Sequence, residues 1–334
     1  MTSSAPIALS LGDPAGIGPE IIVKAWRALK DSGPAFVVVG DRATLVVATG
    51  RDGTPVEAVA TPAEGATAFA RALPVIDIPL GAPAVPGVAS PAAAGRIIAW
   101  IETAARLAMS GEAAAVVTGP IAKAPLYEAG FAFPGHTEFL GQLVPRKGSS
   151  GPVMMLVAGD LRCALATIHE PLAKVPILLT AESIAGAGRT TAAALASDFG
   201  VPRPRLAVAG LNPHAGEAGA IGDEEDRIIA PAVKALRASG VEASGPHPAD
   251  SLFHEKARAA YDAVLCMYHD QALIPVKMLD FWGGVNVTLG VAIVRTSPDH
   301  GVAFDIAGKG VARPDSLVAA LRLARDIAER RGQA

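Results

Sequence analysis

The sequence predicts an α/β fold built around a mainly parallel sheet. Short apolar runs rich in β-branched residues alternate along the chain with longer Ala/Leu-rich stretches, and this alternation is typical of strands joined by crossover helices. No internal repeat or polar linker interrupts the pattern. A chain of 334 residues can bury most of its apolar surface in one large domain or in two modest ones.

The expected strands share a short length, a high apolar content and flanking turn residues. In chain order they are Ile7–Leu11, Phe36–Gly40, Val75–Ile78, Ala114–Thr118, Val153–Val157, Cys163–Thr167, Leu206–Gly210 and Ala263–Tyr268. The polar, Ala/Gly-rich stretch Arg51–Arg71 does not fit this pattern, and we expect it to be an excursion on the surface.

Two helices between these strands have well-marked ends. Ser90-Pro91 supplies an N-cap and a proline in the first turn, and Gly111 follows the last turn of that helix. The second helix runs from about residue 223 to residue 239, with acidic residues in its first turn and Gly240 after its end. Pro231 lies inside this second helix and predicts a kink or a break there.

Composition and charge exclude several classes of protein. With 51% hydrophobic and 18% charged residues, the chain is typical of a globular protein. A net charge of −3 gives no indication of a nucleic-acid surface. The apolar run Ala5–Leu11 is short and has no basic residues before it, which predicts a strand and no signal peptide. Cys163 and Cys266 lie in apolar runs and are expected to be buried, reduced thiols, so we expect a cytoplasmic protein without a membrane span.

A glycine-rich segment, Gly12–Glu20, follows the first expected strand. Its glycines allow a tight turn, and Pro19 suits the first turn of a following helix. Gly16-Ile17-Gly18 resembles the start of a dinucleotide-binding loop, but Ile21 replaces the third glycine, so the Rossmann fingerprint is not met. The spacing favours a turn and a helix cap over direct contact with a ligand.

Three histidines, His169, His214 and His269, each stand among polar residues at the end of an expected strand. Ligands of parallel sheets gather beyond the carboxyl ends of strands, and three neutral imidazoles would suit a catalytic divalent metal. Their spacing is not a local metal motif, so convergence on a metal and separate structural roles are about equally supported. His247 and His254 lack this placement and are expected in turns or on the surface.

Other groups in the sequence could bind anions. Phe133–Glu138 offers an imidazole, a hydroxyl and free backbone N–H groups at the start of a helix expected from Phe139 onward, a good place for phosphate. Lys277, Asn286 and Arg295 interrupt an otherwise apolar stretch. The two cations among them, Lys277 and Arg295, either form partly buried ion pairs or bind carboxylate and phosphate.

The turn-rich segments Arg295–Gly301 and Asp305–Gly310 come last. Residues of this kind at this density predict an ordered surface loop, whose unpaired backbone donors could serve a cofactor.

Taken together, these motifs carry a family resemblance. Gly12–Glu20 and Asp305–Gly310 resemble the signatures of the isocitrate/isopropylmalate dehydrogenase superfamily, whose members bind nicotinamide cofactors without a Rossmann loop. Further motifs resemble the 4-hydroxythreonine-4-phosphate dehydrogenase family within it: Pro134–Glu138, Leu211–Glu217, Tyr268–Gln271 and Arg295–Gly301. The match runs from about Ile7 to the last helix.

The resemblance implies roles for individual residues. The metal ligands would be His169, His214 and His269, contributed by both subunits of a homodimer whose active site lies at the subunit interface. The substrate-binding residues would be His136, Thr137, Lys277, Asn286 and Arg295. Catalytic roles would fall to Lys277, Asp270 and Asp250, and cofactor-binding roles to Asp299, His300, Gly301, Asp305, Gly308 and Lys309.

The resemblance also implies a fold and an activity. Two interwoven α/β domains are expected: a terminal one of about residues 1–115 plus 290–334 with the cofactor loop, and a central one of about residues 116–289 with the metal and the dimer interface. The activity would be oxidation of a small phosphorylated hydroxy acid, 4-phosphohydroxy-L-threonine, in pyridoxine 5'-phosphate biosynthesis. NAD or NADP and one divalent metal (Zn, Mg or Co) would be required, and no nucleic-acid partner is expected.

Other functions stay open on the sequence. A sister dehydrogenase would oxidise phosphorylated erythronate or threonate, or an aromatic cis-dihydrodiol carboxylate, with the same metal and cofactor. An acyltransferase of the phosphate acetyltransferase type would use the same fold, but it would leave three strand-end histidines without a role. A non-catalytic binding module would leave Lys277, Asn286 and Arg295 unexplained.

Overall fold

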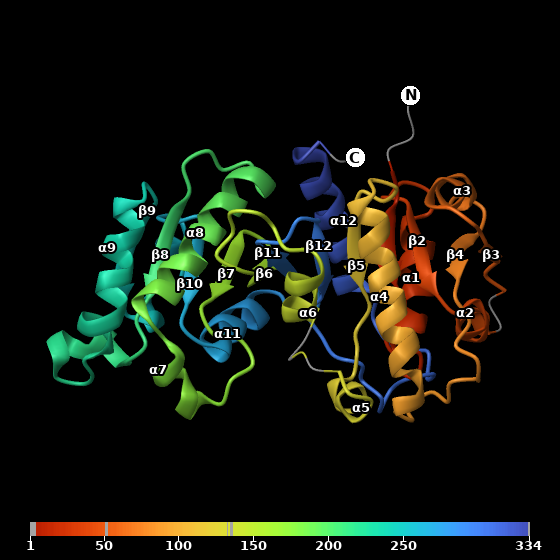
Figure 1. Ribbon diagram of the computed structural model, residues 1–334, viewed down its shortest axis with the longest axis horizontal. Helices are drawn as coiled ribbons and strands as arrows, with labels where there is room; N and C mark the ends of the chain where they lie inside the picture. Colours follow the sequence, from red (N-terminus) through yellow and green to blue (C-terminus); the bar gives the residue numbers. More distant parts are fainter. Residues whose placement is uncertain (1–4, 51–52, 132, 134–135, 333–334) are drawn as a thin grey trace. The chain divides into compact units, whose positions relative to one another are not determined.

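The computed structural model of the chain describes residues 5–50, 53–131, 133 and 136–332, without the side chains of residues 136–138. The chain folds into two compact units. The first joins Met1–Val144 to Ala292–Ala334, and the second is Pro145–Val291. Both ends of the chain therefore belong to the first unit, which is red to yellow plus the last blue segment in Figure 1.

The strands of the first unit run in parallel in the order β3-β4-β2-β1-β5-β12. In chain order they are β1 (Ile7–Ser10), β2 (Phe36–Gly40), β3 (Val56–Ala58), β4 (Leu73–Asp77), β5 (Ala115–Thr118) and β12 (Arg295–Pro298). Because β5 pairs with β1, the unit continues past residue 115, where the sequence suggested a boundary, and it ends after Val144.

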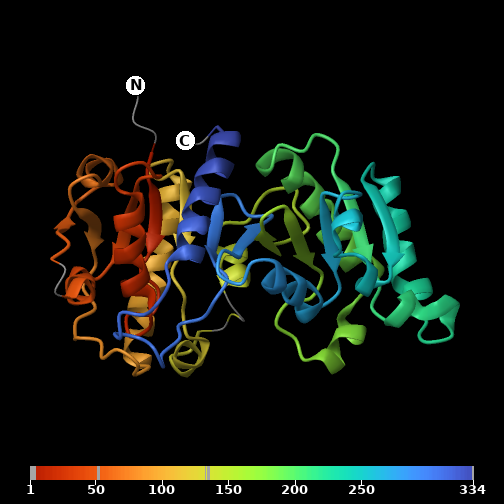
Figure 2. The same cartoon turned by 180° about the vertical axis from the view of Figure 1, so that it is seen from behind.

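Helices cover both faces of these strands. In chain order the helices are α1 (Gly18–Leu29), α2 (Arg42–Thr49), α3 (Pro62–Ala68), α4 (Ala94–Met109), α5 (Lys123–Glu128), α6 (His136–Leu143) and α12 (Asp315–Arg330). Helix α4 lies in front of the strands in Figure 1, and α1 and α12 lie in front of them in the opposite view of Figure 2. The β-strands are therefore sandwiched between helices, as near-continuous apolar strands require.

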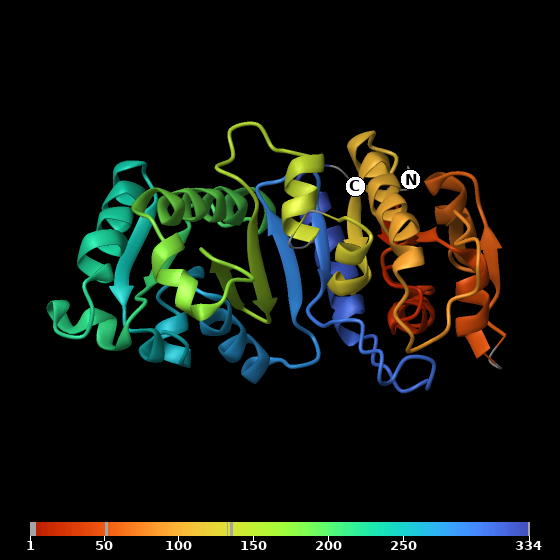
Figure 3. The same cartoon turned by 60° about the horizontal axis from the view of Figure 1, so that its bottom comes forward.

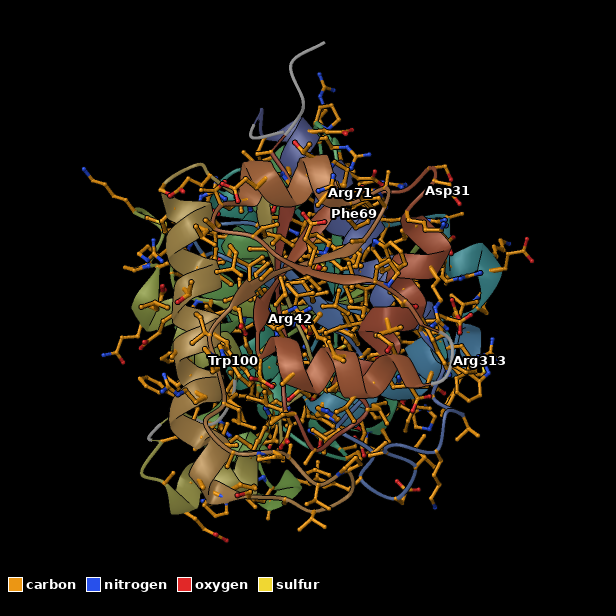
Figure 4. All side chains as sticks on the ribbon, turned by 90° about the vertical axis from the view of Figure 1, so that its right-hand side faces the viewer. Asp31, Arg42, Phe69, Arg71, Trp100 and Arg313 are labelled. Carbon is orange, nitrogen blue, oxygen red and sulfur yellow. The ribbon has the colours of Figure 1, made fainter. Side chains whose placement is uncertain are left out.

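Aromatic side chains anchor the core of the first unit. Trp100 of α4 is fully buried and donates from Nε1 to the carbonyl of Ile78 (3.0 Å). Phe36 and Phe69 meet edge to face with ring centroids 5.0 Å apart, and Trp26 of α1 donates to the Phe69 carbonyl (2.8 Å). Figure 4 views this unit from the side and labels Phe69 and Trp100. Each indole thus buries its ring while its N–H keeps a partner.

The second unit has a mixed sheet in the order β11-β6-β7-β10-β8-β9. Its strands are β6 (Val153–Ala158), β7 (Leu161–Leu165), β8 (Arg205–Ala209), β9 (Glu242–His247), β10 (Ala263–Cys266) and β11 (Val285–Leu289). Strand β6 is antiparallel to both β11 and β7, whereas β7, β10, β8 and β9 are parallel. The parallel strands therefore end at one common edge.

The helical segments of the second unit connect these strands. They are η3 (Leu172–Lys174), α7 (Val175–Leu178), α8 (Ala181–Asp198), η4 (Pro213–Gly219), η5 (Glu225–Ile229), α9 (Ala230–Ala238), η6 (Ala249–Ser251), α10 (Glu255–Arg258) and α11 (His269–Leu279). Figure 3 shows α8 (green) and α11 (blue) on opposite sides of the strands. Helix α11 follows β10 directly, so its first residue stands at the carboxyl edge of the sheet.

Most elements expected from the sequence are present. Each expected strand overlaps an observed one, and a short 3-10 turn, η2 (Pro91–Ala93), leads into α4 ahead of Gly111 (φ 78°). A kink or a break was expected at Pro231; the backbone stays helical there, and its geometry changes from the π-helical turn η5, which ends at Ile229, to α9, which has Pro231 in its first turn. Both cysteines are buried and free, as expected.

Two expectations were wrong. The stretch Arg51–Arg71 contains strand β3 and helix α3 and so completes one edge of the sheet. The segment Arg295–Pro298 is not a surface loop but the fully buried strand β12. Two of its polar side chains are hydrogen-bonded inside the protein: Arg295 donates to Thr118 Oγ1 (2.6 Å), and Thr296 Oγ1 donates to the Ala320 carbonyl (2.8 Å). A segment with the composition of a turn can therefore form a buried strand when its polar side chains are hydrogen-bonded inside the protein.

Within the described part of the chain, no helix has the length and apolar content needed to cross a membrane.

Candidate active site

Two of the three strand-end histidines lie side by side. Strands β7 and β10 are neighbours, and Thr167 Oγ1 donates to the Met267 carbonyl just beyond their ends (2.6 Å). The imidazole rings of His169 and His269 consequently lie with their centroids 5.7 Å apart. Two imidazoles at this separation fit two positions around one divalent ion.

His269 is the first residue of α11 and is oriented by its neighbour. Its Nδ1 lies 2.7 Å from Oδ1 of Asp270. In the tautomer in which Nδ1 carries the proton, the carboxylate accepts it and Nε2 keeps the lone pair that a metal needs. Lys277 lies two turns further along α11, with its Nζ 5.3 Å from the centre of the Phe281 ring. The helix therefore presents a metal-ligand candidate and a proton-transfer candidate on one element.

His214 follows β8 in a segment with unusual backbone geometry. Five successive residues, His214–Ala218, have φ values between 44° and 81°. Four of them carry a Cβ, and a left-handed conformation costs such a residue roughly 1–2 kcal/mol. Among the described residues, no group of three or more His, Cys, Asp or Glu side chains is close enough to hold a metal ion. His214 therefore does not join the other two histidines within one chain.

The ends of β8 and β10 are connected by one buried side chain. Gln271 accepts from the N–H of Met267 (2.7 Å) and donates to the carbonyl of Gly210 (2.8 Å). It is 7% exposed, and sequence reasoning missed it, although it closes the motif Tyr268–Gln271. This glutamine therefore fixes the position at which the chain leaves β8 toward His214, relative to the start of α11.

The second unit also carries Asn286 and Asp250, two polar residues that the family resemblance implies for substrate binding or catalysis. Asn286 lies on β11, and its Oδ1 is buried without a hydrogen-bond partner among the described atoms. An unsatisfied buried acceptor is costly, and a substrate ammonium or hydroxyl group could satisfy it. Asp250 is exposed in the short 3-10 helix η6. For His136 and Thr137 the structure gives only the backbone, at the start of α6, and their side chains lie outside the described part.

Arg295 belongs to the first unit, at the start of β12. It is 1% exposed, and its guanidinium donates to Oγ1 of Thr118 at the end of β5 (2.6 Å). The hydroxyl of Ser10, at the end of the next strand β1, is buried without a partner among the described atoms. Sequence reasoning missed both hydroxyls because Ser and Thr in an apolar strand are common. They place hydrogen-bonding groups at the carboxyl edge beside Arg295.

The glycine-rich motif and the C-terminal turn-rich motif contact each other in the first unit. Glu20 accepts from the N–H groups of Gly310 (3.2 Å) and Ala312 (2.8 Å). Lys24 donates to the carbonyls of the same two residues (2.9 and 2.6 Å) and pairs with Glu20 (2.8 Å). A Cβ on Gly16 would lie 2.9 Å from the Val302 carbonyl oxygen. The glycine-rich motif thus forms a turn, begins α1 and supports the loop around Gly310.

The remaining cofactor candidates lie on that supported loop. The backbone N–H of Asp299 donates to Ser316 Oγ (3.0 Å), and Nδ1 of His300 lies 3.0 Å from the Gly301 carbonyl. A cavity of about 680 Å³ opens beside Gly308 and Gly310, and its lining also includes residues of the glycine-rich segment, α1, α2 and the segment 79–86. The loop therefore borders a space large enough for part of a ligand.

Burial perturbs one carboxyl group of the glycine-rich motif. Asp13 is 3% exposed, and burial raises its pKa above the ordinary value of 3.8. Hydrogen bonds from the backbone of Ala15 and Ala122 oppose this rise in pKa. The Asp13 side chain therefore stabilises the turn through its hydrogen bonds to the backbone.

Fold and site together define an oxidoreductase of the isocitrate/isopropylmalate dehydrogenase-like type. The model of the family described as "Pyridoxal phosphate biosynthetic protein PdxA" matches residues 33–324, and the chain belongs to this family. A relative from Caulobacter vibrioides, named 4-hydroxythreonine-4-phosphate dehydrogenase, is 65% identical over 333 residues, which cover 99% of each chain. A relative of the same name from Maricaulis maris is 53% identical and covers 98% of this chain and 99% of its own.

Solved structures agree with this assignment. The crystal structure of 4-hydroxythreonine-4-phosphate dehydrogenase from Klebsiella pneumoniae has a TM-score of 0.85 and 42% identity, covering 97% of this chain and 100% of that one. A terephthalate 1,2-cis-dihydrodiol dehydrogenase from Burkholderia xenovorans has a TM-score of 0.63 and 29% identity, covering 96% and 98%. The expected fold class and enzyme class are thereby confirmed.

Proposed function

We propose that the protein oxidises 4-phosphohydroxy-L-threonine at C3 with NAD or NADP in pyridoxine 5'-phosphate biosynthesis. The product would be 2-amino-3-oxo-4-phosphooxybutanoate, which loses CO₂ to give 3-amino-2-oxopropyl phosphate. The observation that carries the proposal is the His169–His269 pair, 5.7 Å apart at the strand ends, in a chain 65% identical to a relative named for this substrate.

One divalent metal (Zn, Mg or Co) would be held by His169, His214 and His269. It would lower the pKa of the C3 hydroxyl and stabilise negative charge on that oxygen. Imidazole ligands favour Zn or Co over Mg. Since His214 does not join the other two histidines within one chain, ligands from both subunits of a homodimer would complete the set.

An exposed apolar surface supports the proposed homodimer. Four large apolar side chains on and just after α11 are 51–81% exposed: Ile274, Met278, Phe281 and Trp282. A cluster of this kind is typical of a protein–protein interface. Because α11 begins with His269, a second subunit seated on it would lie beside the metal ligands.

The chain's own residues would bind the substrate and move its proton. Lys277 or Asp270 would take the proton from the C3 hydroxyl as the C3 hydride passes to the nicotinamide ring. Asp250 and Asn286 would meet the amino and hydroxyl groups. Arg295, with His136 and Thr137, would hold the anionic ends of the substrate and so orient C3. The cofactor would lie against the loop that contains Asp299, His300, Gly301, Asp305, Gly308 and Lys309.

The direct test is an assay of metal-loaded enzyme with 4-phosphohydroxy-L-threonine and NAD⁺, followed by the absorbance of reduced nicotinamide with and without a chelator. We expect chelator-sensitive reduction, faster than with phosphoerythronate. No reduction by a folded, metal-replete enzyme would refute the substrate assignment. For the metal, His269→Ala should lose bound zinc, whereas the matched control His254→Ala, at an exposed histidine, should keep it.

A sister activity is the second candidate. The similarity to a structure named as a terephthalate 1,2-cis-dihydrodiol dehydrogenase supports this candidate. Faster reduction with phosphoerythronate, phosphothreonate or an aromatic cis-dihydrodiol carboxylate would move the assignment to that substrate and leave the metal and cofactor proposals standing.

A further inference from the structure

A buried carboxylate accepts hydrogen bonds from the residues that precede His214. Glu225 is 3% exposed and is the first residue of the π-helical turn η5. Its Oε1 accepts from the backbone N–H groups of Leu211 and Asn212, both at 2.7 Å. Its Oε2 accepts from the side-chain amide of Asn212 (2.9 Å). One carboxylate thus accepts three hydrogen bonds from Leu211 and Asn212, which follow β8 after Gly210.

The backbone after these residues needs such support. His214–Ala218 is left-handed, a conformation that is unfavourable for residues with a Cβ. Backbone strain of this kind persists only where the surroundings over-determine the geometry, and it concentrates at functional sites. An isolated turn of this sequence would relax, so the conformation of His214 depends on the groups that hold the segment.

The carboxylate also packs directly against the strained segment. A Cβ added to Gly216 would lie 2.7 Å from Glu225 Oε2 and 2.7 Å from the Gly222 carbonyl oxygen. Gly216 has φ 81°, so glycine is required here both by the backbone and by the close approach of the carboxylate. Glu225 therefore contacts the segment before His214 through hydrogen bonds and the segment after it through packing.

Neighbouring carboxylates do not share this arrangement. Among the described residues, Glu224 bonds only to the side chain of Asn212 (2.7 Å), and Asp226 is exposed on the same turn. Charge-assisted hydrogen bonds to backbone N–H groups are stronger than neutral ones, and two of them converge on Glu225 Oε1. Several carboxylates thus lie near the loop, but of these three only Glu225 accepts hydrogen bonds from its backbone N–H groups.

We propose that Glu225 is a positioning residue that fixes the left-handed His214 segment and thereby presents the His214 imidazole to the metal. The inference rests on the proposed function, in which His214 is a metal ligand. Residues that orient metal ligands typically change metal affinity about 10- to 100-fold when they are replaced. The role predicts an effect on metal binding that a general loss of stability would not produce.

The test uses full-length enzyme stripped of metal and titrated with Co²⁺ in competition with a chelator. Glu225→Ala should lower the Co²⁺ affinity about 10- to 100-fold and change the visible absorption spectrum of the bound Co²⁺. Glu225→Gln keeps an amide oxygen for the N–H groups of Leu211 and Asn212 and should restore most of the affinity. Asp226→Asn, the matched control, should bind Co²⁺ as the unmodified enzyme does.

A folded Glu225→Ala protein with unchanged Co²⁺ affinity and spectrum would overturn the proposal. If Glu225→Ala does not fold, Glu225→Asp decides, because its shorter carboxylate cannot keep all three hydrogen bonds to Leu211 and Asn212: lowered affinity supports the proposal and unchanged affinity refutes it. His214→Ala separates this inference from the proposed function. If His214→Ala keeps full Co²⁺ affinity, the metal-site proposal fails. If His214→Ala loses Co²⁺ while Glu225→Ala and Glu225→Asp keep it, only the positioning role fails.

Discussion

Gln271 donates to the carbonyl of Gly210 at 2.8 Å and, with its other amide atom, accepts from the N–H of Met267 at 2.7 Å. The N–H of Gly210 in turn donates to the carbonyl of His247 (2.8 Å). One side chain therefore joins the end of β10, where His269 begins α11, to the end of β8, from which the chain runs to His214. The relative placement of the two strand ends does not depend on the loops that follow them.

Replacing Gln271 by leucine should destabilise the fold. Leucine matches the glutamine in size, but it leaves the N–H of Met267 and the carbonyl of Gly210 buried without this partner. Each such group costs about 1–3 kcal/mol, so we expect the free energy of unfolding to fall by about 2–4 kcal/mol in urea titrations. Gln142→Leu makes the same change at an exposed helical position and should shift it by less than about 0.5 kcal/mol. Equal effects of the two variants would contradict the bridging role.

Lys24→Met tests whether the hydrogen bonds from Lys24 to the carbonyls of Gly310 and Ala312 support cofactor binding by this loop. The lysine is 30% exposed in its side chain, so the loss of its ion pair should cost little stability. The loop carbonyls that it holds would be released, and we expect the KM for NAD⁺ to rise about tenfold while the KM for the acid substrate stays unchanged. Lys30→Met, at the end of the same helix, is the control and should leave both KM values unchanged. A rise in the substrate KM alone would contradict the assignment of this loop.

The strand-end placement of the histidines could be predicted because it depends only on local pattern. Apolar runs mark the parallel strands, and a polar residue directly after such a run must stand at the carboxyl edge of the sheet. That argument placed His169 and His269 at one edge, and the neighbouring pairing of β7 and β10 brings their rings together. Which strands are neighbours does not follow from local pattern, so the pattern could not say which histidine is separate; only the family resemblance implied that the ligands come from both subunits.

Buried polar side chains were the main source of error. Arg295, Thr296 and Ser297 have the composition of a turn, yet they form strand β12, in which Arg295 and Thr296 find partners that are distant in the sequence. Arg295 bonds to Thr118, which is 177 residues away. Glu225 looks like one of several acidic residues at the start of a helix, and only its burial distinguishes it. Long-range satisfaction of polar groups has no signature in a single sequence.

Thr118→Val should weaken substrate binding through Arg295. Valine keeps the shape of threonine but removes the hydroxyl that accepts from the guanidinium at 2.6 Å. A hydrogen bond to a charged group is worth about 1.5–3 kcal/mol, so we expect the KM for the phosphorylated substrate to rise about tenfold or more, with the KM for NAD⁺ unchanged. Thr296→Val removes a hydroxyl bonded to the Ala320 carbonyl instead, and it should lower stability by about 1 kcal/mol without changing either KM. If both variants change the substrate KM equally, Thr118 has no specific role.

His247 should make the stability of the protein depend on pH. Burial lowers the pKa of its imidazole below the ordinary value of 6.5, and the nearby Arg237 lowers it further. Below pH 6.5 the unfolded chain therefore binds a proton at this site that the folded chain takes up only at lower pH, and the free energy of unfolding decreases as the pH falls through this window.

The variant His247→Gln removes this contribution. Urea titrations at pH 7, 6 and 5 should show a smaller loss of stability on acidification for His247→Gln than for the unmodified protein. Ser244→Ala is the matched control: it removes the hydroxyl 2.9 Å from Nε2 but keeps the imidazole, so it should retain most of the pH dependence. Parallel stability curves for His247→Gln and the unmodified protein would show that other groups cause the pH dependence, because a half-buried imidazole with a lowered pKa must make the two curves diverge below pH 6.5.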